Sequence, residues 1–335
     1  MDQNTDFQNK LLTVSPSPHI HRRGLSTASV MKDVFIALLP AAIWGSYAFG
    51  WRAAVILLIS VVSSVAFEAL TEILLRRTVT ISDCSAAVTG LLLGMNLPSS
   101  VPFYIPVLGS AFAIIVVKQL FGGIGKNVMN PALAARVFLT LSFAGKMTIF
   151  YPFRQTVDAV ASATPLASLK TGALPEGTTI WNLFFGQTGG CIGEVSALLL
   201  IVGGVYLLIR KVIRWQIPVA FLGTVALLTF LFPRGGLTAF SDRLDFMLAS
   251  LLSGGLLLGA IFMATDYVTS PVTPWGRVIF GVGCGALVVF LRYFSAYNEG
   301  VSFAILIMNA FVWYLDKFTM PRVYGKERRE KKPKA

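Results

Sequence analysis

Residues 53–75 read AAVILLISVVSSVAFEALTEILL, an apolar run whose only charged side chains are Glu68 and Glu72. A helix needs about 20 such residues to cross the hydrocarbon core of a bilayer. Comparable runs recur along the whole chain of 335 residues, of which 55% are hydrophobic and 13% are charged. Soluble domains carry about 25% charged residues. The sequence therefore predicts an all-α polytopic membrane protein and excludes an ordinary soluble enzyme.

The apolar runs predict about ten transmembrane helices, several of them short or interrupted by glycine and proline. Such breaks are tolerated where the backbone faces protein or a cavity and not lipid. The loops between the runs hold twenty Lys and Arg residues on the side of the N-terminus and seven on the other side. Cytoplasmic loops carry the excess of these residues, so both termini are predicted to be cytoplasmic. The expected spans are 34–51, 53–75, 81–97, 102–120, 131–149, 195–209, 216–232, 246–265, 278–294 and 301–315.

A repeated pentapeptide predicts that these helices form two five-helix inverted repeats. GLLLG stands at residues 90–94 and again at 255–259, each time in the third span of a set of five. Each copy is followed by a polar break, which contains Asn96 in the first set and Asp266 in the second. Because five is odd, the second set enters the membrane from the opposite side. The expected organisation is a cytoplasmic segment 1–33, a first repeat 34–149, an extracytoplasmic loop 150–194, a second repeat 195–318 and a basic cytoplasmic tail 319–335.

The formal charge of +12 does not indicate a nucleic-acid-binding protein, because nine of the 28 Lys and Arg residues cluster at the two ends, beside membrane spans. Such clusters are typical of cytoplasmic retention and of contact with anionic lipid headgroups. The three cysteines, Cys84, Cys191 and Cys284, have no CxxC spacing, and an iron–sulfur cluster generally needs four ligands. We therefore expect no metal site built by this chain alone.

Ionisable side chains inside membrane spans are costly and suggest function. Glu68 and Glu72 lie four residues apart, so a helix presents both on one face. Together with Asn96 and Asp266 they are candidates for an ion path, since hard cations prefer oxygen ligands. The structural alternative is that Glu72 and Asp83 merely lie near membrane interfaces, paired with Arg76 or Arg77, and that Asp266 caps a helix or pairs with Arg277.

Residues 121–132, FGGIGKNVMNPA, combine three glycines with a predicted helix start at Pro131. Proline favours the first helical position, and Asn130 before it is a favourable N-cap. Exposed backbone N–H groups at such a start suit an anionic or polar heterocyclic ligand. The spacing is not that of a P-loop. A tight cytoplasmic turn would have a similar composition, and both interpretations stay open.

Residues 158–166, DAVASATPL, form a small-residue loop by composition. A residue that precedes proline is held in an extended conformation. The hydroxyl of Thr164, before Pro165, is therefore accessible to a modifying enzyme.

Taken together, these segments resemble the RnfD proteins of the Rnf complex and, more distantly, the NqrB proteins of the sodium-translocating NADH:quinone reductase. The resemblance implies a subunit, not catalytic alone, of an ion-pumping ferredoxin:NAD+ oxidoreductase in the bacterial cytoplasmic (inner) membrane. Such a subunit passes electrons across the membrane through flavin, coupled to Na+ or H+ transport, beside subunits of the A, B, C, E and G types. The stretches that carry the resemblance are 15–19, 89–98, 121–132 with Arg136, 158–166 and 259–266, in family order from residue 15 to about 325.

The resemblance further implies that Thr164 carries FMN through a phosphoester bond, installed by a flavin transferase. The family pattern reads roughly Asp-x-x-Ser-Gly-Ala-Thr, and this chain has Ala161 and Ser162 where the pattern has Ser and Gly. Ser162 is the alternative hydroxyl. A second, non-covalent flavin, riboflavin, is also implied, without assigned residues. The expected flavin-binding segment comprises Asp158, Ser162, Ala163, Thr164 and Pro165.

Two other functions remain open at this stage. An inverted repeat with broken helices is also the architecture of secondary transporters and channels. A structural subunit of the same complex that carries no flavin would explain the two departures from the attachment pattern. The segment 158–164 distinguishes them, because a transporter has no use for a flavin anchor.

Overall fold

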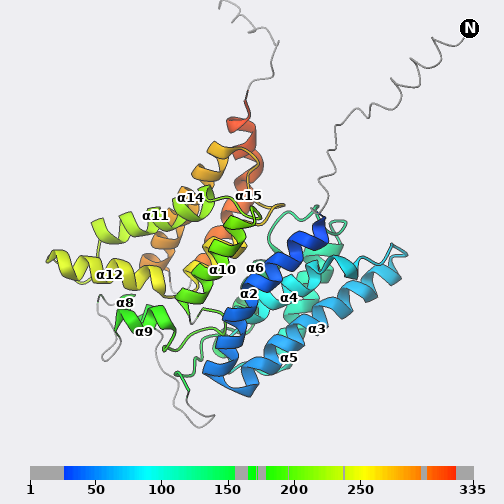
Figure 1. Cartoon of the computed structure of the whole chain (residues 1–335), viewed down its shortest axis with the longest axis horizontal. Helices are drawn as coiled ribbons and strands as arrows, with labels where there is room; N and C mark the ends of the chain where they lie inside the picture. Colours follow the sequence, from blue (N-terminus) through cyan, green and yellow to red (C-terminus); the bar gives the residue numbers. More distant parts are fainter. Residues whose placement is uncertain are drawn as a thin grey trace, which may run out of the picture.

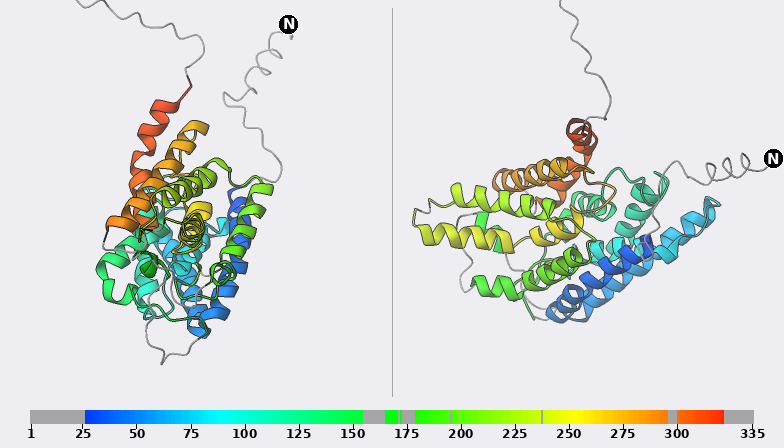
Figure 2. Two further views of the ribbon diagram at one scale, coloured as in Figure 1. Left: turned by 90° about the vertical axis from the view of Figure 1, so that its left-hand side faces the viewer. Right: turned by 45° about the horizontal axis from the view of Figure 1, so that its top comes forward.

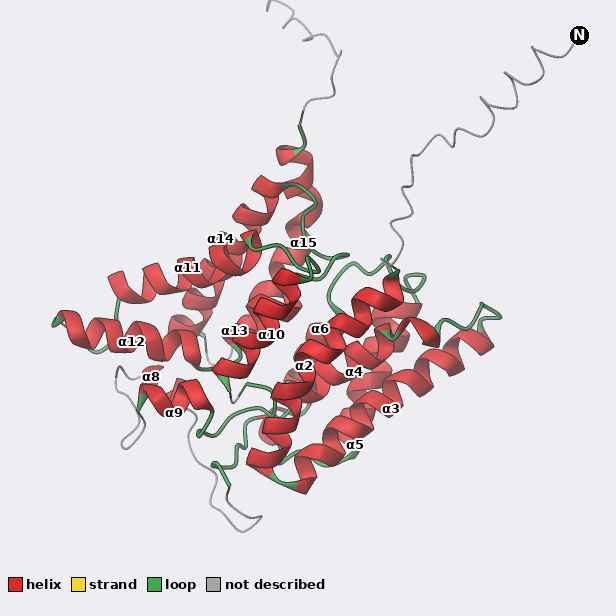
Figure 3. Cartoon of the chain, in the orientation of Figure 1, coloured by secondary structure: helices red, strands yellow, loops and turns green. Residues whose placement is uncertain are grey.

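The structure, a computed structural model, describes residues 26–154, 165–170, 172, 179–194, 196–236, 238–295 and 300–321. Within these ranges the chain forms helices, turns and loops and no β-strand (Figure 3). Pro98 and Cys191 form an isolated antiparallel bridge. Asp158, Ser162, Ala163 and Thr164 lie outside the described residues. The described part of the chain confirms the all-α prediction.

The helices follow the order of the predicted spans. The first set consists of α2 (Thr27–Phe49), α3 (Trp51–Leu74), the 3-10 turn η1 (Ile81–Asp83), α4 (Ser85–Met95), α5 (Tyr104–Ala111) continuing into the π-helix η2 (Phe112–Gln119), α6 (Pro131–Ser142) and α7 (Ala144–Met147). Two short helices, α8 (Pro165–Lys170) and α9 (Ile180–Phe185), follow. The second set consists of α10 (Ala197–Ile209), α11 (Gln216–Leu231), α12 (Phe240–Leu252), α13 (Leu256–Leu258) continuing into the π-helix η3 (Gly259–Met263), α14 (Pro274–Phe294) and α15 (Val301–Thr319).

The protein is a polytopic membrane protein, but ten full-length spans are not confirmed. In the described residues four helices, α2, α3, α14 and α15, are long and apolar enough to cross a membrane. A fifth span results if α12 and α13–η3, which are bent by 60°, count as one. The other apolar helices are shorter, because glycine, proline and polar breaks end them early; the expected span 81–97, for example, contains only the 11-residue α4.

The two sets of helices lie side by side, with the blue to cyan set next to the yellow-green to red set (Figures 1 and 2). Within the first set α3 packs against α4, α5 and η2, and within the second α11 packs against α12 and α14. Contacts between the sets join α2 to α10 and α6 to α15. Helices α2 and α6 of the first set thus contact α10 and α15 of the second.

The two GLLLG copies occupy different places in their helices. In α4, a Cβ on Gly90 would lie 2.5 Å from the carbonyl oxygen of Ser60, so glycine lets α4 approach α3 closely. In the second copy Gly255 adopts a left-handed φ of 65° just before α13, and Gly259 faces Val301 of α15. The first copy lies inside a helix and the second begins one, so the repeated letters occupy different positions in the two sets.

The bend between α12 and α13 is stabilised by a buried arginine. The last carbonyl groups of a helix have no partner within the helix. Arg292 of α14 donates from Nη1 to the carbonyl of Ser250 (2.6 Å) and from Nη2 to that of Ser253 (2.9 Å). Gly254 follows with a φ of 70°, which allows the chain to turn. Arg292 therefore donates to carbonyl groups at the end of α12 that would accept from backbone N–H groups if the helix continued.

Candidate functional site

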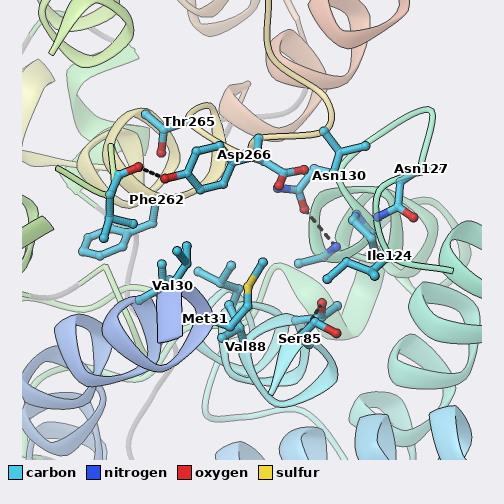
Figure 4. A pocket seen from close by; sticks show the side chains of 18 of the residues that line it. Val30, Met31, Ser85, Val88, Ile124, Asn127, Asn130, Phe262, Thr265 and Asp266 are labelled. Carbon is cyan, nitrogen blue, oxygen red and sulfur yellow. Dashed lines mark hydrogen bonds between the residues drawn. The ribbon is translucent and has the colours of Figure 1, made fainter. Parts of the chain in front are cut away.

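The main cavity lies where the ends of several broken helices meet (Figure 4). The space in it that can hold water-sized molecules is about 90 Å³. Its apolar walls come from α2, α4, α10 and η3, including Met31, Val34, Val88, Leu92 and Phe262. Its polar side chains include Ser85, Lys118, Asn127, Asn130, Thr265 and Asp266.

The glycine-rich loop before α6 forms one wall of this cavity. Gly122, Gly123 and Gly125 all have positive φ values (112°, 91° and 85°), a conformation that side chains disfavour. Asn130 caps α6, since its Oδ1 accepts from the N–H groups of Ala132 (3.0 Å) and Leu133 (3.3 Å). The predicted N-cap and the proline at the first helical position are confirmed. The loop is both a tight turn and a cavity wall, so the two interpretations of its sequence are compatible.

Asn130 also joins the two sets of helices at the cavity. Its Nδ2 donates to the carbonyl of Met263, the last residue of η3, at 3.2 Å. Both polar atoms of Asn130 are thus used within the protein. Asn127 differs, because its Oδ1 is buried and has no hydrogen-bond partner in the described residues. Asn127 also lines the cavity.

Asp266 lies on the cavity wall just after η3 (Figure 4). Its Oδ2 accepts from Thr269 Oγ1 at 3.0 Å. Arg277, the alternative partner considered above, donates from Nε to the carbonyl of Pro271 instead (3.0 Å). Asp266 is accordingly held in a local turn, with its carboxylate at the cavity.

Behind the cavity, Glu68 and Glu72 belong to one buried polar cluster. Lys118 of η2 donates to Glu68 Oε1 and, at 2.5 Å, to Ser85 Oγ. Gln119 Nε2 lies 3.3 Å from Oε1 of both glutamates and bridges them. The second of the two carboxylates, Glu72, also accepts from the backbone N–H of Thr80 (2.9 Å). The shared helix face predicted from the i, i+4 spacing is therefore a buried one.

Asn96 lies in a separate buried cluster centred on Arg136 of α6. Arg136 Nη1 donates to Asn96 Oδ1 and to Glu194 Oε1 (3.1 Å), and Nη2 donates to Cys191 Sγ (3.4 Å). The segment that carries Cys191 and Glu194 is held against the end of α4, where the N–H of Gly193 donates to the carbonyl of Met95 at 2.7 Å. The four residues proposed for an ion path thus fall into three places: Glu68 with Glu72, Asn96, and Asp266.

A smaller cavity, with about 20 Å³ of space for water-sized molecules, lies at the start of α8. Pro165, the residue after Thr164, is buried and begins α8. It lines this cavity together with Leu166, Glu194 and Ser253. Thr164 is therefore bonded to a residue that forms part of the cavity wall.

Sequence reasoning missed three residues of these clusters. Lys118 and Arg292 each stand inside an apolar run, and the rule that intramembrane charges suggest function would have selected both. The contact of Cys191 with Arg136 could not be predicted, because no residue near Cys191 in the sequence indicates an arginine partner on another helix. The roles of all three are set by contacts with residues distant in sequence.

The geometry suits a flat ligand with a polar edge. Apolar walls would bury the faces of such a ligand, and the amide of Asn127 offers an acceptor beside its own N–H donors at the rim. The ammonium of Lys118 is already paired with Glu68, so the cavity offers little charge for a phosphate. A neutral heterocycle fits these groups best.

The chain is similar to known proteins over nearly its whole length. The family described as NQR2, RnfD, RnfE matches residues 13–325. The chain is 45% identical over 328 residues to the D component of the Na+-translocating ferredoxin:NAD+ oxidoreductase complex of Acetobacterium woodii, covering 97% of this chain and 98% of that protein. It is 40% identical to the D component of the proton-translocating ferredoxin:NAD+ oxidoreductase complex of Clostridium ljungdahlii, covering 96% and 98%. It is 39% identical to the D component of the ion-translocating oxidoreductase complex of Stutzerimonas stutzeri, covering 91% and 94%.

Proposed function

Because the chain belongs to the NQR2, RnfD, RnfE family, we propose that it is the D-type component of an Rnf-type ion-translocating ferredoxin:NAD+ oxidoreductase complex. The observation that carries this proposal is the match to relatives that bear this name over more than nine-tenths of both chains. Such a match includes every helix described above. The subunit transfers electrons and takes part in ion transport, and it is not catalytic alone.

The complex would reside in the bacterial cytoplasmic membrane. The excess of Lys and Arg on one side supports cytoplasmic termini and an extracytoplasmic loop 150–194. Partners are the other Rnf subunits, of the A, B, C, E and G types, together with a flavin transferase and Na+ or H+. The iron–sulfur centres would belong to other subunits, since this chain has only three cysteines.

Two flavins are proposed, and they supply the electron chemistry when bound. FMN would be attached to Thr164, whose neighbour in the sequence, Pro165, lines the smaller cavity. Riboflavin would occupy the main cavity, whose apolar walls and unpartnered Asn127 Oδ1 suit an uncharged isoalloxazine with an imide edge. In the cavity the chain would bind and orient the ring and exclude water from its faces.

We expect Val88→Phe to remove the non-covalent flavin. Val88 is buried in the cavity wall, and overfilling a packed site costs about 1–3 kcal/mol, or roughly tenfold or more in affinity. The measurement is acid-extractable flavin per purified chain, expected near one in the wild type. Val202→Phe, on an exposed face of α10, is the control and should retain the wild-type amount. Equal flavin in both variants would place the ligand elsewhere.

We propose that Asp266 contributes to ion coupling, with Glu68, Glu72 and Asn96 as the other candidates. Asp266→Asn should lower ion-coupled activity of the assembled complex several-fold and lower its flavin content less, because the amide keeps the size but loses the charge. Ion uptake by vesicles and extracted flavin measure the two effects. Asp242→Asn, at the exposed start of α12, is the matched control. Wild-type uptake by Asp266→Asn would exclude this carboxylate from the ion path.

A secondary transporter remains the second candidate, supported by the broken helices alone. Function resides in the site and not in the fold. Flavin bound to the purified chain would exclude a plain transporter.

A further inference from the structure

We propose that Lys118 links the main cavity to Glu68, so that Glu68 takes up one proton when the ligand in the cavity gains one electron. This inference rests on the proposed flavin in that cavity. It assigns to Lys118 a positioning role, because Lys118 acts through Glu68 and is not itself oxidised or reduced.

Lys118 belongs to the cavity and to the buried cluster at once. Its side chain lines the cavity, is only 2% exposed, and donates to Glu68 Oε1 and to Ser85 Oγ. Ser85 also lines the cavity and donates to Asp83 Oδ1 at 2.7 Å. Lys118 lies in the last turn of a π-helix, an irregularity that frequently marks functional sites. The ammonium therefore stands between the cavity and one particular carboxylate.

The charge of Glu68 depends on this ammonium. Glu68 is fully buried, and its Oε2 has no hydrogen-bond partner in the described residues. Its other oxygen accepts from Lys118 and from the neutral amide of Gln119. A buried carboxylate without a counter-charge is strongly disfavoured. Any change that draws Lys118 away makes the protonated form of Glu68 the stable one.

Glu72 lacks this dependence although it lies one turn further along α3. Its Oε2 accepts from Thr80 N–H and its Oε1 from Thr80 Oγ1 (2.5 Å) and Gln119. These donors are neutral and belong to the cluster, so they stay in place whatever occupies the cavity. Glu72 is thus a matched control for Glu68 on the same helix face.

Counting Glu68 itself, the charged groups of this cluster are three carboxylates and two cations. The carboxylates are Glu68, Glu72 and Asp83 in η1, and the cations are Lys118, which donates to Glu68, and Arg77, which donates to the carbonyl of Gln119 (3.2 Å). Helices α2, α4 and α5 also pack against α3, and their ionisable residues are Lys32, Asp33 and Tyr47 in α2 and Tyr104 in α5. Lys118 is the cation that pairs with Glu68 in the described residues.

The proposed step is balanced. One electron passes from the one-electron donor of the complex to the cavity ligand, and one proton passes from Lys118 Nζ to Glu68, breaking an N–H bond and forming an O–H bond. Lys118 Nζ takes up one proton from solvent water through the open mouth of the cavity and remains an ammonium, now attracted by the additional negative charge. The net change is one electron on the ligand and one proton on Glu68.

Redox-difference infrared spectroscopy of the full chain with its flavin tests this proposal. In Thr164→Val, which keeps only the non-covalent flavin, reduction should produce a carboxylic acid C=O band that shifts in D2O. Glu68→Gln should abolish the band and Glu72→Gln should retain it. Lys118→Met should abolish it, because Glu68 is then protonated in both states, and Lys118→Arg should restore it. The double variant Glu68→Gln/Lys118→Met, which buries no unpaired charge, is the folding control.

Each result decides a separate point. A band that persists in Glu68→Gln, or that disappears in Glu72→Gln, overturns the assignment to Glu68. Flavin bands without any carboxylic acid band overturn the proton uptake and leave the proposed function intact. Absence of flavin bands altogether overturns the flavin site of the proposed function, and this inference with it.

Discussion

Replacing Thr164 with valine should leave the chain without covalently bound flavin. Valine has the shape of threonine but no hydroxyl, and a phosphoester requires that oxygen. The loss should be complete, because attachment is a covalent bond that either forms or does not. Chain co-expressed with its transferase should gain one FMN in intact mass and fluoresce after denaturing electrophoresis, whereas Thr164→Val should do neither.

The neighbouring hydroxyl provides the control for this experiment. Ser162 stands where the family pattern has glycine, two residues before Thr164. Ser162→Ala should keep the full mass increment. If Thr164→Val fluoresces and Ser162→Ala is dark, the attachment belongs to Ser162, and if both fluoresce it lies outside this segment. A wild-type chain without added mass would favour the structural subunit considered above.

Arg136→Met should destabilise the protein by about 3–5 kcal/mol, because removing one partner of a buried ion pair leaves the other charge uncompensated. Arg136 is 7% exposed and donates to Glu194, Asn96 and Cys191, which lie on segments far apart in sequence. Thermal unfolding in detergent, followed by intrinsic fluorescence, measures the loss. The cluster joins α6, the end of α4 and the segment before α10, so all three should loosen together.

Two further variants test whether the uncompensated buried charge causes the loss of stability in Arg136→Met. The double variant Arg136→Met/Glu194→Gln removes both charges and should recover a large part of the stability. Arg210→Met breaks a second ion pair, with Asp33, in which the arginine side chain is 52% exposed and the aspartate side chain 12%. Because Asp33 keeps the hydrogen bond from Tyr206 and its cation lies largely in solvent, this variant should lose less stability than Arg136→Met. Equal losses in Arg136→Met and Arg210→Met would contradict the role of burial.

Local features of the fold could be predicted from the sequence, because neighbouring residues determine them. The start of α6 is an example: Asn130 and Pro131 are a cap and a first helical residue in any context that allows a helix there. The expected span 216–232 corresponds closely to α11 for the same reason. The flavin anchor could be named only through the resemblance to a family.

Contacts between distant segments could not be predicted in the same way. Lys118 meets Glu68 across 50 positions and Arg136 meets Glu194 across 58, and no periodicity relates the members of either pair. The bend within the eighth expected span was not predicted either. The helix ends at Met263, where the polar break at 263–266 was expected, but the chain also bends earlier, where Gly254 and Gly255 adopt left-handed conformations and Arg292 satisfies the free carbonyls.

The bond between Arg136 and Asn96 has a consequence for how the chain is made. A ribosome produces Asn96 before Arg136, and Glu194 follows only 58 residues after the arginine. During that interval the guanidinium of α6 enters the membrane without its carboxylate, a situation that bilayers penalise. Asn96 Oδ1 is already present on the end of α4 and can accept from it at once. The asparagine thus serves as the first partner of the arginine during insertion, and the glutamate completes the cluster when the second half of the protein emerges.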